Sequence, residues 1–198
     1  MKVQSIKNTR TTMRKLVFFS LFALLLAGVS QGQVKWQPVE QAAATDLKTN
    51  RKLFLIDFST SWCGYCKKMD QETFTDPVVA AILNRYYIPV HFNAEGNDTF
   101  TWAGVKYAGT NSLNSKTKTP HSFTRAVLGQ RIGYPSFAIF GANQSLVQIL
   151  QGYQSAYDFS MLLWYFCSGD YQRYPMERYR QVFDSEIKPA MMKQLGLR

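Results

Sequence analysis

The stretch that decides the fold runs from Lys52 to Met69 and reads "KLFLIDFSTSWCGYCKKM". Its first part, Lys52–Thr60, is a nearly continuous apolar run with aromatic and branched members, which is typical of a central strand covered on both faces. The residues after Ser61 follow a helical spacing, so Cys63 is predicted where a strand passes into a helix. The Cys63/Cys66 spacing by itself fits half of a zinc site, a structural disulfide or a redox pair.

The predicted position of Cys63 favours redox chemistry. Unpaired N–H groups and the positive end of the helix dipole stabilise an anion, so we expect the pKa of the Cys63 thiol to be lowered. Cys66, one turn further in, is expected to lie beneath Cys63 and to resolve a mixed disulfide formed there. Gly64 is expected to permit the close approach of the two cysteines.

The other two kinds of site fit less well. Structural zinc needs four ligands, and beyond the pair the chain offers only Cys167, His91 and His121, none at a short ligand spacing. A purely structural bridge is disfavoured because so short a loop removes little entropy from the unfolded chain. We therefore expect a redox-active Cys63–Cys66 disulfide, no metal and no other cofactor.

Asp57 interrupts the apolar strand six residues before Cys63. A carboxylate in such a strand loses hydration, so it is paired, protonated or functional, and burial alone raises its pKa.

Further helices and strands are predicted along the chain. Thr75 or Asp76 can cap a helix that Pro77 begins, and residues 88–95, "IPVHFNAE", read as a strand. A hairpin is predicted over 136–153 with its turn at 141–143, followed by a helix that ends at Gly169. This order favours an α/β fold with a central mixed sheet, in which a parallel core carries a hairpin edge, and helices lie on both faces.

Three quoted motifs carry a resemblance to a known family: "LIDF" at 55–58, "WCGYCK" at 62–67 and "IGYPSFAIF" at 132–140. With them the chain resembles the thioredoxin superfamily. It is most similar to the secreted thioredoxin-like branch in which the motif continues as "CKKMDQETFTDPVVAAILN", from Cys66 to Asn84. The resemblance spans roughly Trp36 to Gly169 with one long interruption, and it implies a thioredoxin-like fold.

The resemblance also implies roles for single residues. Cys63 would be the nucleophile, Cys66 the resolving thiol and Pro135 a cis-proline facing the disulfide, while Asp57 matches the buried acid that helps to move the proton of Cys66. His91 would stand where classical thioredoxins place a lysine near that acid, or it is an ordinary surface or core histidine.

Substrate contacts are implied for residues around the cysteines and before the proline. The residue before Pro135 tunes redox behaviour in the family, and here it is Tyr134, where many relatives carry Thr or Val. Trp62 is expected to pack at the rim of the site or to serve simply as core support. The predicted substrate-binding residues are Trp62, Gly64, Tyr65 and Tyr134.

Two segments depart from a minimal thioredoxin. An insertion at about 96–130 is predicted to hold a small hairpin around Gly104 and a short helix; its Phe100, Trp102 and Tyr107 either line the active-site groove or cover a sheet edge. A helical extension over 171–198 follows the domain predicted at 33–170, and Pro189 is expected to kink or end its helix. Cys167 is expected to be a buried, inert thiol.

The first residues have the pattern of a secretory signal peptide, predicted at 1–32 with cleavage near Gly32. Five basic residues and no acid precede the apolar run 16–27, whose twelve residues fall short of the roughly 20 that span a membrane. An uncleaved anchor is the alternative. Beyond 1–32 the chain keeps 18 of its 23 basic residues against 13 acids, about +5, and they are scattered, so no nucleic-acid binding is expected.

Together these features predict a periplasmic thiol-disulfide oxidoreductase that reduces protein disulfides. The alternatives are an oxidase or isomerase of the same fold, and a binding or assembly module whose cysteines are redox-idle. The expected partners are protein disulfides and a membrane redox protein that exchanges electrons with the pair. We expect a monomer.

Overall fold

The computed structural model describes residues 32–110 and 119–197. The predicted signal peptide, up to residue 31, lies outside the described residues. In the part of the chain that the structure describes, no helix is long and apolar enough to cross a membrane. The elements are, in chain order, α2 (Val39–Ala43), β1 (Leu53–Ser59), α3 (Gly64–Glu72), α4 (Pro77–Tyr86), β2 (Tyr87–Asn93), β3 (Thr99–Trp102), β4 (Val105–Ala108), α5 (Ser122–Leu128), β5 (Ser136–Phe140), β6 (Leu146–Gln151), α6 (Ala156–Cys167), η1 (Asp170–Gln172), α7 (Met176–Val182), η2 (Phe183–Ile187) and α8 (Lys188–Leu195).

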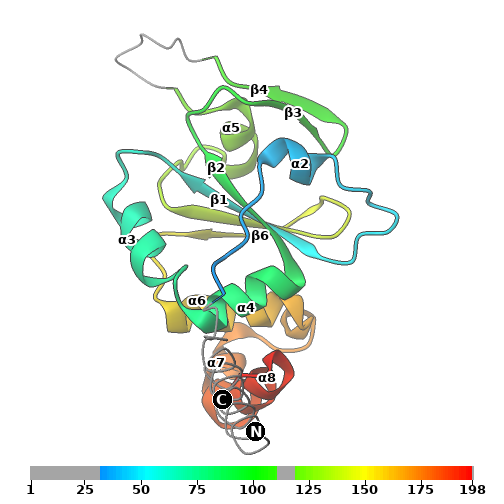
Figure 1. Ribbon diagram of the computed structural model, residues 1–198, viewed down its shortest axis with the longest axis vertical. Coiled ribbons are helices and arrows are strands. Elements are labelled where there is room, and N and C mark those ends of the chain that lie inside the picture. Colours follow the sequence, from blue (N-terminus) through cyan, green and yellow to red (C-terminus); the bar gives the residue numbers. More distant parts are fainter. Residues whose placement is uncertain (1–31, 111–118, 198) are drawn as a thin grey trace, which may run out of the picture. The chain divides into compact units, whose positions relative to one another are not determined.

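The main sheet has the order β2-β1-β5-β6 (Figure 1). β1 and β2 are parallel, whereas the β1–β5 and β5–β6 pairs are antiparallel. The predicted mixed sheet is therefore confirmed, and its parallel part is a single strand pair. The register sets Asp57 of β1 beside His91 of β2.

Each face of the sheet is covered by its own apolar core, because successive side chains of a strand point to opposite faces. On one face, Phe54, Ile56 and Phe58 of β1 pack with residues of α2, α5 and β3. On the other face, Leu55 packs with residues of α3, α4 and α6. Asp57 lies two residues after Leu55 in β1, so its side chain points to the same second face. The carboxylate therefore lies on the side of the sheet that α3 covers.

The insertion forms a layer on the first face (Figure 1). β3 and β4 pair across a tight turn at Ala103 and Gly104, whose φ angles are 48° and 81°, and α5 lies against them. Phe100 and Trp102 are 6% and 2% exposed, and Trp102 packs edge-on against Phe54 at 5.1 Å between ring centroids.

The expectation that the aromatic residues of the insertion line the active-site groove is wrong. They are buried or half-buried in the core of the first face, and Phe123 of α5 lies at their centre. They also cover a face of the sheet rather than its edge, since their partners include Phe54 and Phe140 from the two central strands.

The C-terminal segment is helical throughout α7, η2 and α8 and packs on the second core. Tyr179 and Phe183 are fully buried, and the Tyr179 ring lies 4.6 Å from that of Tyr165 in α6. Pro189 does not end the helical segment. It occupies the first turn of α8, where a missing N–H is tolerated. The π-helical turn η2 directly precedes α8.

Candidate active site

The cysteine motif lies at the junction between β1 and α3, as predicted. Cys63 and Cys66 form a disulfide, and Cys63 is the N-cap of α3, whose Cys66 N–H donates to the Cys63 Sγ at 3.1 Å. Cys66 was expected to lie beneath Cys63, but the two cysteines are 5% and 4% exposed, so in the disulfide form Cys66 is hardly less exposed than Cys63. Gly64 was expected to permit the close approach of the cysteines; a Cβ atom there would meet nothing within 4 Å outside its chain neighbours, so the space around it does not demand glycine.

Exposed aromatic residues surround the disulfide. Trp62 and Tyr65 are 65% and 64% exposed, which rules out a core-support role for Trp62. The Trp62 indole N–H donates to a Glu95 carboxylate oxygen at 3.0 Å, and its ring lies 5.8 Å from that of Tyr134. The Tyr65 ring contacts that of Tyr153 in a tilted arrangement, with 6.3 Å between the ring centroids. The motif thus carries an apolar rim open to solvent.

The predicted cis bond is observed between Tyr134 and Pro135. The loop is held from two sides: the Gly152 N–H donates to the Pro135 carbonyl at 2.8 Å, and the Ser136 hydroxyl donates to the Gly133 carbonyl at 2.6 Å. Burial, reinforced by the negative charge of Glu95, raises the pKa of Tyr134 to about 12, so this phenol stays neutral. The ring contact between Trp62 and Tyr134 places the proline loop beside the cysteine motif.

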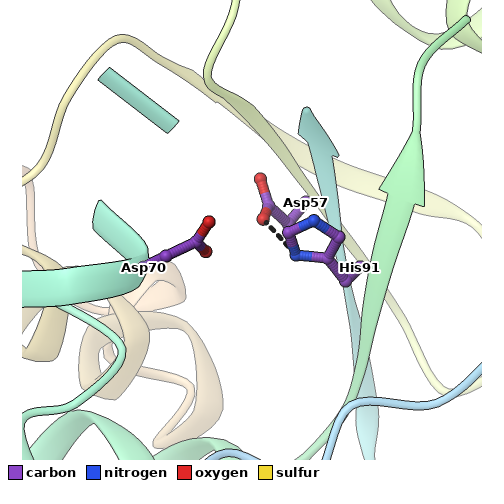
Figure 2. A group of neighbouring side chains, drawn as sticks. All are labelled: Asp57, Asp70 and His91. Atoms are coloured by element: carbon purple, nitrogen blue, oxygen red, sulfur yellow. Dashed lines mark ion pairs between the residues drawn. The ribbon is translucent and has the colours of Figure 1, made fainter. Parts of the chain in front are cut away.

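Behind the motif, Asp57, His91 and Ser59 form a chain of polar contacts. The His91 Nδ1 lies 3.2 Å from Asp57 Oδ2, and its Nε2 lies 2.9 Å from the Ser59 hydroxyl (Figure 2 draws the Asp57–His91 contact). Strand geometry explains the grouping, because Asp57 and His91 are neighbours in the parallel register and Ser59 is two residues further along the same face.

The environment shifts the pKa of both members of this pair upward. Burial raises the pKa of Asp57, which is 2% exposed, and the hydrogen bond from His91 only partly offsets this effect. The hydrogen bond to Asp57 raises the pKa of His91, and partial burial opposes it. The pair therefore holds a proton more tightly than a free aspartate and histidine would.

A pocket of about 300 Å³ lies between His91 and the cysteine motif, and both His91 and Cys66 line it. Asp70 and Ser59 line the same pocket. The structure thus places Trp62 of the cysteine motif beside Tyr134, which precedes Pro135, and places Asp57 in contact with His91, which shares the pocket with Cys66.

Sequence reasoning missed four residues of this region. Asp70 lies one helical turn after Cys66, a spacing that puts both on one face of α3. Ser59 follows Asp57 at the spacing of one strand face. These two could have been found from periodicity, but the contacts of Glu95 and Tyr153 depend on how separate elements pack.

Cys167 is half-buried at the end of α6. Burial raises the pKa of this thiol to about 12, and the thiol lies 3.6 Å from the Trp164 carbonyl. The thiol is less buried than predicted, and its raised pKa disfavours the reactive thiolate; its inertness stays a prediction.

Comparison with known proteins gives a family. The thioredoxin-like domain family matches residues 39–166, which is more than half of the chain. Among curated proteins no relative was found.

Similar solved structures include a thioredoxin-fold protein from Helicobacter pylori, with 15% identity over 86% of this chain and 95% of that one and a TM-score of 0.43. A mutant thioredoxin from Halobacterium salinarum NRC-1 is similar over 69% of this chain and 92% of that one, with 15% identity and a TM-score of 0.41. A DsbH oxidoreductase is similar over 64% of this chain and 78% of that one, with 15% identity and a TM-score of 0.41. Because the family matches more than half of the chain, and the chain carries the Cys63–Cys66 pair, it belongs to the thioredoxin-like domain family.

Proposed function

We propose that the protein is an exported thiol-disulfide oxidoreductase that reduces protein disulfides through Cys63 and Cys66. The observation that carries the proposal is the disulfide at the N-terminus of α3, where the Cys66 N–H donates to the Cys63 sulfur. In the reduced protein the same N–H and the helix dipole favour the thiolate of Cys63.

The reaction proceeds in two exchanges. The Cys63 thiolate attacks a substrate disulfide, which forms a mixed disulfide and releases one substrate thiolate. The Cys66 thiolate then attacks the Cys63 sulfur, which restores the Cys63–Cys66 disulfide and releases the second substrate thiol. Two electrons pass to the substrate, and an external reductant, for which we propose a membrane redox protein, must return them.

Proton transfer is assigned to the pair behind the motif, in which Asp57 is buried and His91 is exposed. Cys66 must lose its proton before it can attack, and the pocket that it shares with His91 offers a route to the Asp57–His91 pair. The raised pKa of Asp57 supports this role, since a base works best when its pKa lies close to the working pH.

The proposed substrate class is an extended or unfolded protein segment. Trp62 and Tyr65 present large exposed rings beside the disulfide, and Tyr134 extends this apolar rim toward Pro135. Exposed apolar surface of this kind on a soluble domain marks a site of contact with proteins or ligands. In this proposal, the backbone at Tyr134 aligns the substrate and the rings hold its side chains.

A trapping experiment tests the proposal. In a Cys66→Ser protein the second exchange is blocked, so substrate proteins should remain bound as adducts that a reducing agent releases. The Cys63→Ser, Cys66→Ser double variant is the matched control and should trap none, while the parent should reduce insulin with a chemical reductant as electron source. Absence of reducible adducts together with absence of insulin reduction would reject the enzyme assignment in favour of a redox-idle binding module.

A further inference from the structure

Three side chains behind the cysteine motif offer ligand atoms at close range. Asp57, Asp70 and His91 each contribute one oxygen or nitrogen, and these atoms all lie within 4.8 Å of one another. In Figure 2 the carboxylate of Asp70 extends from α3 toward the Asp57–His91 pair. We propose that this cluster, formed by Asp57, Asp70 and His91, is a binding site for a divalent transition-metal ion of the zinc class.

The spacing of the cluster is close to what a metal ion requires. Ligands that lie 2.0–2.2 Å from a tetrahedral ion are about 3.4 Å from one another. His91 Nδ1 and Asp57 Oδ2 are already 3.2 Å apart. Asp70 must approach by roughly an ångström to complete the set. It can do so because it lies exposed on the surface of α3.

A second observation points to a ligand independently of the spacing. Asp57 is 2% exposed, and its Oδ1 has no hydrogen-bond partner among the residues that the structure describes. A buried carboxylate oxygen without a partner is costly, since it has lost hydration and gained nothing in return. A bound cation would neutralise this carboxylate.

The surroundings of His91 also suit a metal ligand. When a histidine binds a metal through one ring nitrogen, the other usually donates its proton to a nearby acceptor, which fixes the tautomer. The Ser59 hydroxyl lies 2.9 Å from His91 Nε2 and can accept that proton when an ion is bound, so that Nδ1, which donates to Asp57 in the metal-free protein, becomes the ligand atom. Imidazole nitrogen and carboxylate oxygen are both zinc ligands, and three protein ligands leave a fourth position open for water.

This site has no signature in the sequence, because its carboxylate and imidazole ligands come from three separate elements that only the fold brings together. One neighbour opposes a cation: Lys67, which lines the same pocket. Its side chain is exposed, so it can turn to solvent. It also provides a test, since its removal should strengthen metal binding.

The experiment is a calorimetric titration of the disulfide form with Zn²⁺ near pH 7.5. All proteins carry Cys167→Ser, so that no free thiol can bind the ion. The parent should bind one Zn²⁺ per chain. Asp70→Asn should weaken binding at least tenfold and Lys67→Gln should tighten it several-fold, whereas Glu186→Gln, the same loss of an exposed carboxylate far along the chain in η2, should leave it unchanged.

Failure of the parent to bind, or an Asp70→Asn affinity within twofold of that of the parent, would overturn the proposal. Asp70 lies on the surface, so its variant should fold, and a thermal melt checks this. A second readout is the NMR signal of the His91 ring, which should shift on addition of Zn²⁺ in the parent and not in Asp70→Asn.

A consequence for catalysis rests on the proposed function. While an ion is bound to Asp57 and His91, these two side chains cannot accept the proton of Cys66. Zn²⁺ should therefore slow the second exchange. The titration uses the disulfide form and needs no turnover. A failed trapping experiment therefore leaves the metal site standing, and a failed titration leaves the redox cycle standing.

Discussion

Replacement of Asp57 by asparagine tests the proton route most sharply. The substitution keeps the shape of the side chain and removes its ability to accept a proton. The parent holds this carboxyl at 2% exposure with a raised pKa, behind the pocket shared by Cys66 and His91. We expect the second exchange to slow while the first, made by Cys63 at the other side of the motif, continues.

The size of the effect follows from the geometry. A positioned general base contributes about 10²–10⁴-fold to a rate. His91 remains in the pocket and can accept the proton in part, so we expect the lower end of this range, about 10²-fold, which corresponds to about 2.7 kcal/mol in the barrier.

The two exchanges can be observed separately with a symmetric aromatic disulfide whose thiolate is coloured. Attack by Cys63 releases the first coloured thiolate, and resolution by Cys66 releases the second. In rapid mixing, Asp57→Asn should show a normal first phase and a slowed second phase. Cys66→Ser should release only one thiolate, and Glu186→Gln should behave like the parent. A second phase in Asp57→Asn within threefold of the parent would refute the route.

Three further predictions concern the aromatic layer of the insertion, the pH dependence of stability at the Asp57–His91 pair, and Cys167. Phe123→Ala should lower the free energy of unfolding by about 3–5 kcal/mol in urea melts, because Phe123 is 1% exposed at the centre of the aromatic layer, and Phe123→Leu should cost much less; equal, small losses would contradict a structural role for the insertion. The melting temperature of the parent minus that of Asp57→Asn should fall as the pH rises from about 4 to about 8. Folding raises the pKa of Asp57 above its usual 3.8 and the pKa of His91 above its usual 6.5, so both stabilising contributions are lost as the pH rises. A constant or rising difference would contradict the raised pKa values. Cys167→Ser should leave insulin reduction unchanged, and altered turnover would give this thiol a role that its raised pKa argues against.

Local patterns predicted the motif well because the relevant physics is local. The apolar run before Cys63, the helical spacing after it and the capping aspartate at position 76 each act over a few residues, and all three are observed. The Asp76 carboxylate accepts from the N–H groups of Val78 and Val79, as a cap should. The cis bond at Pro135 was predicted from the resemblance and not from local physics.

The remaining features depend on packing between distant segments. Phe100 and Trp102 alternate as one face of a strand, but only the position of α5 decides whether that face meets a groove or a core. Asp70 follows Cys66 by one turn, yet its nearness to Asp57 and His91 depends on how α3 lies against the sheet. Pro189 was expected to interrupt a helix, and the π-helical turn that precedes it has no clear sequence signal.

The central claim is that Cys63 and Cys66 form a redox couple that reduces protein disulfides. The most direct test is the equilibrium reduction potential of the pair, measured by trapping free thiols in graded redox buffers. A two-electron transition near the value of thioredoxin, about −270 mV, is the predicted result. A pair that does not titrate as a two-electron couple, or one that titrates near about −120 mV as an oxidant does, would contradict the claim.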